Sequence, residues 1–322
     1  MKRLRNLLVA LLMLGFVLTS PLHTQAQTQG SNGLSITPTR FEFTIERGKS
    51  DLASIQIKNV TDQPILAKAF INDFEADGNT GNPKLIIDDS RERSSSSIKD
   101  FVLGLEDVEV PGGETKVVNL PIQIPENAAP SAYYGAIRFQ SAKPNSDEIT
   151  SPQVALNASV AALVLIEVPG DITEKVEISS IGAYLDDKKG TIFTKKPMKV
   201  GIEVNNLGNG FSKPFGKVSV SGPWGKGEVL SYELNNTDPR GNVLPNSKRL
   251  FLNDLSGVSL PGRYTITANI SHGRGGQVLT ATTSFWFIPS WLIIVLAVLL
   301  LALVIAAVYV YRKYVTKGLR RK

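Results

Sequence analysis

Apolar residues gather in two unbroken runs near the ends of the chain, and short alternating runs fill the region between them. Behind a basic start, residues 7–18 form an apolar run of 12 residues, and the small-residue site Thr24-Gln25-Ala26 follows it. A run of this length is too short to cross about 30 Å of hydrocarbon at about 1.5 Å per helical residue. The pattern therefore predicts a cleaved signal peptide over residues 1–26.

The second apolar run, residues 291–311, contains 21 residues and no charge. It is long enough for roughly 31 Å of helix, so we expect one transmembrane helix over residues 290–311. Aromatic rings flank this run where the headgroup region would lie, and basic residues follow it at once. The residues expected to anchor the chain in the membrane are Trp291, Tyr309, Tyr311, Arg312 and Lys313.

The basic tail, residues 312–322, predicts which side of the membrane each part occupies. Positive charge next to a membrane span marks the cytoplasmic side. The signal peptide directs the preceding part of the chain outward, so both ends agree on one orientation. We expect a single-pass protein of the cell membrane, with extracellular N-terminal domains and a cytoplasmic tail.

The region between the ends alternates with a period of two. In residues 54–60, for example, Ile55 and Ile57 alternate with polar residues. This pattern is typical of antiparallel strands with one buried face. The runs expected as strands are 41–45, 52–60, 65–74, 115–124, 133–139, 154–168, 172–181, 198–204, 217–220, 229–234, 249–252, 264–270 and 278–287. Residues 154–168 are apolar enough for a buried strand or a helix, and the flanking prolines and β-branched content favour a strand.

A weak internal repeat divides this region into two units. Asn59 in Ile57-Lys58-Asn59-Val60-Thr61 corresponds to Asn206 in Val204-Asn205-Asn206-Leu207-Gly208, and a proline turn later feeds a strand bearing Tyr133 or Tyr264. About seven short strands per unit predict an all-β protein with two tandem immunoglobulin-like β-sandwiches and one transmembrane helix. The expected organisation is signal peptide 1–26, linker 27–33, domain 1 at 34–170, domain 2 at 171–289, helix 290–311 and tail 312–322.

The charge balance argues against nucleic acid as a partner. The chain carries 35 Lys plus Arg against 29 Asp plus Glu, but three bases lie in the first five residues and six in the last eleven. Without those nine, 26 bases face 29 acids, so no basic face is indicated. The chain has no Cys, which excludes disulfides, thiolate metal sites and cysteine nucleophiles.

Candidate chemistry is sparse, and we expect no catalytic residue, no cofactor and no bound metal. His272, in a Gly-rich hairpin loop, follows Ser271 directly, which is not the arrangement of a catalytic triad. Residues 73–79 imitate the start of a calcium loop, but position 12 is Lys84 where a carboxylate is required. An acidic β-turn is favoured there, and weak calcium binding by another geometry stays open.

Two further features of the sequence, the adjacent aspartate pairs and Trp224, are consistent with either a structural or a binding role. The adjacent pairs Asp88-Asp89 and Asp186-Asp187 would point to opposite faces of a strand, so we interpret them as turn residues. Trp224 lies in the turn Gly222-Pro223-Trp224-Gly225, where it could stack on a sugar or touch a partner, although packing at a sheet edge is favoured.

The motifs of the first domain resemble the N-terminal domain of the WxL-interacting proteins of Gram-positive cell surfaces. The segments that carry the resemblance are Ile36-Thr37-Pro38-Thr39-Arg40, the turn at 59–64, residues 73–78, Val110-Pro111-Gly112-Gly113-Glu114 and residues 124–135. The resemblance implies two immunoglobulin-like domains, with binding of peptidoglycan by the first and of protein partners, including host factors, by the second. It also implies WxL-type surface proteins as partners of the chain. The chain itself contains no Trp-x-Leu sequence.

The sequence thus predicts a membrane-anchored surface protein that binds wall polymer or surface proteins without catalysis. The alternative is an envelope chaperone or transporter accessory protein that caps exported clients through an exposed sheet edge. An anchored hydrolase is the least favoured function, because the acids show no suitable clustering.

Overall fold

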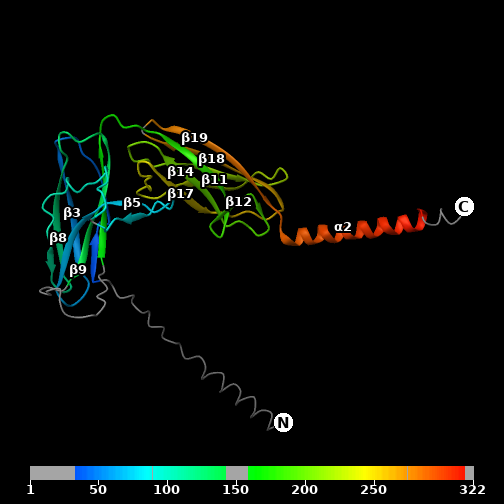
Figure 1. Cartoon of the computed structure of the whole chain (residues 1–322), viewed down its shortest axis with the longest axis horizontal. Coiled ribbons are helices and arrows are strands. Elements are labelled where there is room, and N and C mark those ends of the chain that lie inside the picture. The colour runs from blue at the N-terminus through cyan, green and yellow to red at the C-terminus, as the bar shows by residue number, and fades with distance from the viewer. Residues whose placement is uncertain (1–32, 89, 143–158, 274, 316–322) are drawn as a thin grey trace, which may run out of the picture.

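The computed structural model describes residues 33–88, 90–142, 159–273 and 275–315. The predicted signal peptide, nearly all of the predicted linker and the end of the basic tail lie outside the described residues. Figure 1 shows two bodies built from strands and one long helix that leaves the second body. The predicted all-β class with two tandem sandwiches and one C-terminal apolar helix is confirmed.

Domain 1 packs a three-stranded sheet against a five-stranded sheet, with strand orders β1-β3-β8 and β2-β10-β9-β4-β7. A small hairpin, β5-β6, lies outside both sheets. The strands are β1 (Leu34–Thr37), β2 (Arg40–Thr44), β3 (Ser50–Asn59), β4 (Ile65–Asn72), β5 (Phe74–Ala76), β6 (Pro83–Leu85), β7 (Val108–Val110), β8 (Thr115–Gln123), β9 (Ser131–Ala142) and β10 (Ser159–Val168).

Domain 2 repeats this arrangement, with strand orders β12-β11-β14-β17 and β13-β19-β18-β15-β16. Its strands are β11 (Val176–Leu185), β12 (Lys188–Gly190), β13 (Ile192–Phe193), β14 (Lys199–Asn206), β15 (Phe215–Ser221), β16 (Glu228–Leu234), β17 (Ser247–Asp254), β18 (Gly262–His272) and β19 (Gln277–Phe287). In domain 1 the first strand is divided between the two sheets as β1 and β2, and β2 runs parallel to the last strand, β10. In domain 2 the short strands β12 and β13, which follow β11, lie in different sheets in the same way, and β13 runs parallel to the last strand, β19. The internal repeat predicted from the sequence therefore corresponds to two domains with a similar strand topology.

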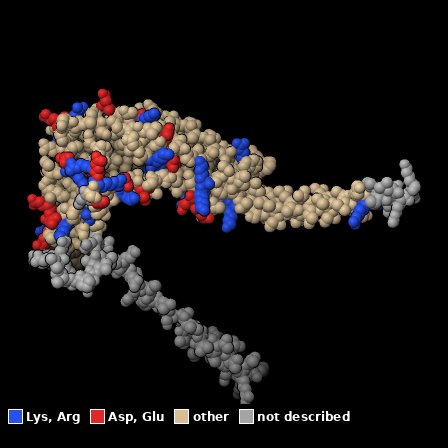
Figure 2. All heavy atoms as spheres, in the orientation of Figure 1, with Lys and Arg blue, Asp and Glu red and all other residues tan. Residues whose placement is uncertain are grey.

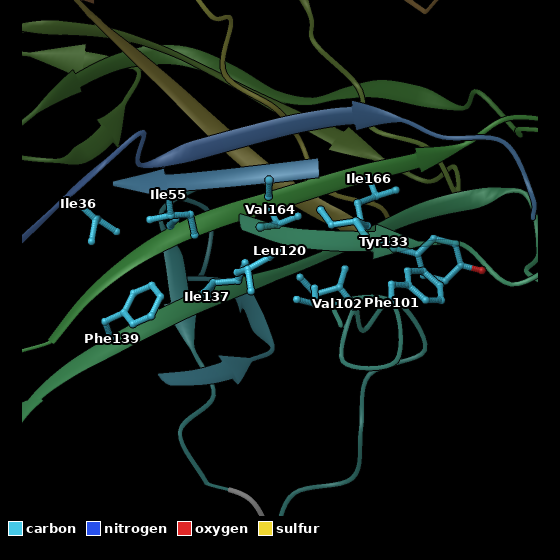
Figure 3. Packing of buried hydrophobic residues seen from close by; sticks show 14 of the residues in the cluster. Ile36, Ile55, Phe101, Val102, Leu120, Tyr133, Ile137, Phe139, Val164 and Ile166 are labelled. Atoms are coloured by element: carbon cyan, nitrogen blue, oxygen red, sulfur yellow. The ribbon is translucent and has the colours of Figure 1, made fainter. Parts of the chain in front are cut away.

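Alternation along the strands fills the space between the sheets. Ile55 of β3 and Leu120 of β8 face Ile137 of β9 and Val164 of β10, and all four side chains are fully buried (Figure 3). Domain 2 has an equivalent core between its own sheets. Each domain therefore buries its own apolar cluster, as the period-two pattern predicts.

A buried asparagine at the end of an inner strand explains the sequence repeat. Asn59 Nδ2 donates to the carbonyl oxygens of Gln63 (2.7 Å) and Val110 (3.0 Å), and its Oδ1 accepts from the backbone N–H of Thr61 (2.9 Å). Asn206 makes the matching bonds. A buried amide in this position satisfies backbone groups of two loops at once, because it offers both donors and an acceptor.

Tyr133 and Tyr264, the two tyrosines of the internal repeat, have the same role in their domains. The hydroxyl of Tyr133 donates to the carbonyl oxygen of Ala129 at 3.0 Å, and that of Tyr264 donates to Leu260 at 2.8 Å. Each tyrosine thus packs its ring into a core and binds the backbone four residues earlier. The large aromatic predicted at the start of each of these strands is confirmed.

The structure corrects one assignment and confirms two. His272 is the buried last residue of β18, and it does not lie in the hairpin loop predicted for it. The reason is that β18 and β19 stay paired up to His272 and Gln277. Residues 159–168 form a strand, as favoured over a helix. Asp186 and Asp187 are turn residues, with φ of 49° and 59°.

Replacing Asn206 by Ala should lower the free energy of unfolding of domain 2 by about 1–3 kcal/mol, because the carbonyls of Gly210 and Val243 lose a buried donor. Urea unfolding followed by tryptophan fluorescence measures this, since all three tryptophans lie beyond residue 170. The matched control is Asn205→Ala, which removes only an exposed bond to Glu177. Equal effects of the two substitutions would contradict the assignment.

Candidate functional site between the two domains

An apolar cluster joins the two domains. Leu165 of β10 and Ala136 of β9, on the outer face of the five-stranded sheet, pack with Phe74 of the β5-β6 hairpin and with Leu244 of domain 2. Phe211 of domain 2 packs against the same cluster. Burial of this apolar area holds the two domains in contact, because separation would expose it to water.

Hydrogen bonds fix that arrangement at two further places. Asn209 of domain 2 accepts from the backbone N–H of Ala132 at 2.9 Å, and its Nδ2 donates to the carbonyl oxygen of Pro130 at 3.0 Å. At the tip of the β5-β6 hairpin, Asn79 Nδ2 donates to Glu203 Oε2 at 2.9 Å, and the carbonyl of Asn79 accepts from the N–H of Leu250. The hairpin of domain 1 therefore reaches β14 and β17 of domain 2.

A cleft of about 490 Å³ opens beside this interface. Glu42 and Phe43 of β2 line one wall together with Leu165 and Glu167 of β10. The residues of the opposite wall come from domain 2 and include Glu174, Phe211, Lys213, Phe215, Arg240 and Asn242. The walls combine aromatic rings with charges of both signs, which suits a ligand that is partly apolar and partly polar.

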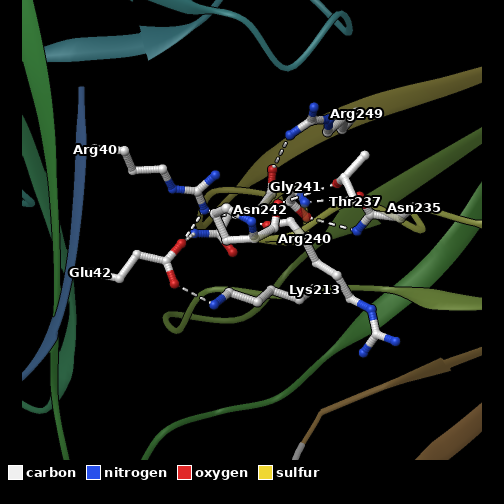
Figure 4. Close-up of polar contacts among 10 residues, drawn as sticks. Arg40, Glu42, Lys213, Asn235, Thr237, Arg240, Gly241, Asn242 and Arg249 are labelled. Carbon is white, nitrogen blue, oxygen red and sulfur yellow. Dashed lines mark hydrogen bonds and ion pairs between the residues drawn. The ribbon is translucent and has the colours of Figure 1, made fainter. Parts of the chain in front are cut away.

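Glu42 connects the two walls (Figure 4). Its carboxylate pairs with Arg40 of its own strand and with Lys213 of domain 2, and it accepts from Asn242 Nδ2 at 3.4 Å. The Glu42 side chain is 29% exposed, so water does not fully screen these contacts. Burial raises the pKa of Glu42, but the hydrogen bond from Lys213 and the charges of Arg40 and Lys213 together hold this pKa below its ordinary value.

Three side chains around Glu42 complete the polar part of the site. The guanidinium of Arg40 donates to the carbonyl oxygen of Arg240 at 3.4 Å. The guanidinium carbon of Arg240 lies 4.0 Å from the centre of the Phe215 ring, which is a cation–π contact. Asn242 Oδ1 is buried and has no hydrogen-bond partner within the described residues. This oxygen is an acceptor that a bound N–H group would satisfy.

The edge of β2 is the second component of the site. In the described part of the chain β2 is the outermost strand of its sheet. The N–H of Leu163 donates to Thr39 at 2.9 Å, and the N–H of Ile45 donates to Glu167 at 3.1 Å. Since a parallel strand bonds through alternate residues, Arg40, Glu42 and Thr44 direct their backbone N–H and C=O groups away from β10. An open edge of this kind accepts another strand.

The predicted membrane-anchor residues lie at the two ends of α2 (Ser290–Val310) and in the following π-helical turn (Tyr311–Val315). Trp291 is in the first turn, and Lys313 Nζ lies 5.9 Å from the centre of the Tyr309 ring. No residue of α2 is buried, and the space-filling view shows an uncharged rod up to its far end (Figure 2). A helix that is apolar on all sides and uncovered by protein has the properties of a membrane span.

The acidic loop singled out in the sequence has a structural role. Glu75 pairs with Arg91 at 3.1 Å and with Lys84 at 3.9 Å, and Asp73 is buried and accepts from the N–H of Ser94. Within the described residues no group of three His, Asp or Glu side chains is arranged to hold a metal ion. His272 is buried next to Gly273 of the cleft, and burial lowers its pKa.

Acid should loosen the contact between the domains. The pKa of Glu42 is lowered in the folded chain, so its carboxylate stabilises the contact between the domains fully at pH values above the ordinary pKa of 4.5. This stabilisation is lost as the pH falls through the folded-state pKa. The chain has no Cys, so dyes at Val117→Cys and Lys226→Cys report the interdomain distance by energy transfer. We expect the distance distribution to broaden as the pH falls below 4.5, and to be equally broad at pH 7 in Glu42→Gln.

The matched control for that measurement is Glu46→Gln, which makes the same charge change at an exposed position outside the cleft. Its distance distribution at pH 7 should equal that of the unsubstituted chain. A Glu42→Gln variant that behaves like Glu46→Gln would contradict the role of Glu42.

Comparison with known proteins finds no matching family model and no matching curated protein. Among solved structures, the class 5 fimbriae chaperone CfaA shares 15% identity over 80% of this chain and 99% of its own, with a TM-score of 0.37. The E. coli chaperone DraB shares 12% identity over 79% and 96%, with a TM-score of 0.36. A Porphyromonas gingivalis protein of unknown function shares 14% identity over 79% and 100%, with a TM-score of 0.30. At these values the similarity assigns neither a function nor a site.

Proposed function

We propose that this chain is a membrane-anchored, outward-facing binding protein that holds an extended segment of a protein partner against β2, at the mouth of the interdomain cleft, without catalysis. The observation that carries the proposal is the open edge of β2 directly beside a cleft of about 490 Å³. Backbone pairing supplies affinity in strand addition, and pockets beside the edge supply specificity.

The walls of the cleft suit such a segment. A strand added to β2 would pair with the outward N–H and C=O groups of Glu42 and Thr44, and its side chains would alternate between two faces. On the face toward domain 2 they would meet Phe211, Phe215 and the charges of Lys213 and Arg240. The unpartnered Asn242 Oδ1 offers an additional acceptor on this side.

The anchor and its orientation belong to the same proposal. The 21 residues of α2 are enough for roughly 31 Å of helix, and Arg312 and Lys313 follow it on the side proposed to be cytoplasmic. Domains 1 and 2 would then stand outside the membrane. A partner segment would be held at the cell surface.

Two kinds of partner fit the edge of β2. A resident surface protein, for which the resemblance to WxL-interacting proteins suggests WxL-type proteins, would stay bound. An exported client would leave after folding, which is the chaperone function. The lifetime of the complex distinguishes the two, because a client should exchange while a resident partner should persist. Binding of peptidoglycan by domain 1 is the competing proposal.

Thr44→Pro should weaken strand addition, since it removes an outward N–H but no bond to β10. Full-length protein in detergent is incubated with surface and exported proteins from the same cells, and the captured protein is quantified. Loss of one backbone bond predicts about a tenfold weaker capture. The matched control Thr44→Val keeps the N–H and should capture normally.

Purified peptidoglycan forms the second arm of this experiment. Retention on peptidoglycan with equal protein capture by Thr44→Pro and Thr44→Val would sink the strand-addition proposal and favour wall binding. A difference between the two variants in protein capture would support it, because both substitutions change the same side chain.

A further inference from the structure

No flexible linker separates domain 2 from α2. Phe287, the last residue of β19, pairs with both Gly262 and Phe193. Only Ile288 and Pro289 separate it from α2, and both are hydrogen-bonded: Ile288 N–H donates to Phe193 at 2.8 Å, and Pro289 accepts from Leu292 at 2.9 Å. Strand β19 therefore ends directly where the helix begins (Figure 1).

Trp224 lies at this same end. It is in the turn between β15 and β16, is 84% exposed and has a φ of 59°, a left-handed conformation that few bulky residues adopt. Its Nε1–H donates to the carbonyl oxygen of Pro261 at 2.8 Å. Pro261 precedes Gly262, the partner of Phe287, so Trp224 is held beyond the last strand pair on the side of α2.

Other exposed apolar side chains share this end of the domain. Ile192 pairs with Trp286, Met198 precedes the start of β14, and Leu260 lies beside Pro261. We call the membrane-proximal face the surface formed by Ile192, Met198, Trp224, Leu260 and Trp286, all of which are exposed. Exposed apolar side chains that gather at one end of a domain indicate an interaction site.

The charges around this face are suited to an anionic surface. Lys195 and Lys196 follow Phe193, in the segment that runs past Phe287 toward the helix, and Lys226 follows Trp224 by two residues. All three lysines are exposed. Four acids also lie at this end of domain 2. Two of them form ion pairs, Asp187 with Lys199 and Glu228 with Lys217. The other two are Asp186 and Asp254.

We propose that the membrane-proximal face docks on the outer surface of the bilayer that α2 enters. The Trp224 indole would lie in the interfacial region, where amphipathic rings are preferred, and the three lysines would face anionic headgroups. The short connection at Ile288 and Pro289 makes the lipid surface the occupant, because it holds this face where the helix enters the membrane. The inference rests on the proposal that α2 crosses the membrane.

The docked face would set the position of the binding cleft. Gly273, which lines the cleft, follows the last residue of β18, and Gly262 at the start of β18 lies at the membrane-proximal end. The 11 residues of β18 span roughly 36 Å at about 3.3 Å per residue. The edge of β2 would therefore be presented at a fixed height above the lipid.

Fluorescence of Trp224 in the full-length chain tests this inference. In a Trp286→Phe, Trp291→Phe background, Trp224 is the only tryptophan. The chain is reconstituted into liposomes of phosphatidylglycerol and phosphatidylcholine brominated near the headgroup. We expect blue-shifted emission, quenching by the brominated lipid and about twofold or greater protection from aqueous iodide. A variant that combines three charge reversals, Lys195→Glu, Lys196→Glu and Lys226→Glu, should reduce all three effects.

The matched control places a single tryptophan at Val117 of β8, an exposed position in domain 1, with Trp224→Phe in the same background. This tryptophan should be quenched by iodide and not by the lipid. Equal iodide and lipid quenching at the two positions would overturn the docking proposal. Flotation of the same liposomes separates this result from failure of the anchor, since a chain that does not float contradicts the membrane span itself.

Discussion

The arrangement of the two β domains depends on the apolar contact between the two sandwiches. Leu165 and Ala136 cover the outer face of a sheet that would otherwise meet water, and Phe74 and Leu244 close over them. This burial is non-directional, so it brings the domains together without choosing an angle. The bonds of Asn209 and Asn79 lie at separate points around the cluster and fix that angle. A cleft with a constant shape follows from this rigid junction.

The junction also gives the edge of β2 its importance. An isolated edge strand is a liability that natural proteins usually cover. Here the edge lies at the opening of the cleft, and Glu42, which belongs to β2, pairs with Lys213 across it. The same strand therefore takes part in holding the domains together and in forming the proposed binding surface. Binding at β2 and movement between the domains should accordingly be coupled.

The sequence predicted the features that depend on local pattern. Ile55 and Ile57 indicated a half-buried strand, the apolar run at the C-terminus indicated α2, and Asn59 and Asn206 marked the repeat. The cleft could not be predicted, because Glu42 and Lys213 are 171 positions apart and no local periodicity relates them. The β5-β6 hairpin was foreseen only as a turn, since its role depends on contacts with domain 2.

If an extended partner segment pairs with β2, a photocrosslinker attached to this strand should capture that segment in intact cells. A chain without Cys accepts a single Thr44→Cys substitution, to which a benzophenone is attached. We expect a crosslink to one contiguous partner segment from position 44, and none from the same probe at Val117 on β8. Crosslinks of equal yield from both positions, or from Val117 alone, would contradict strand addition at β2.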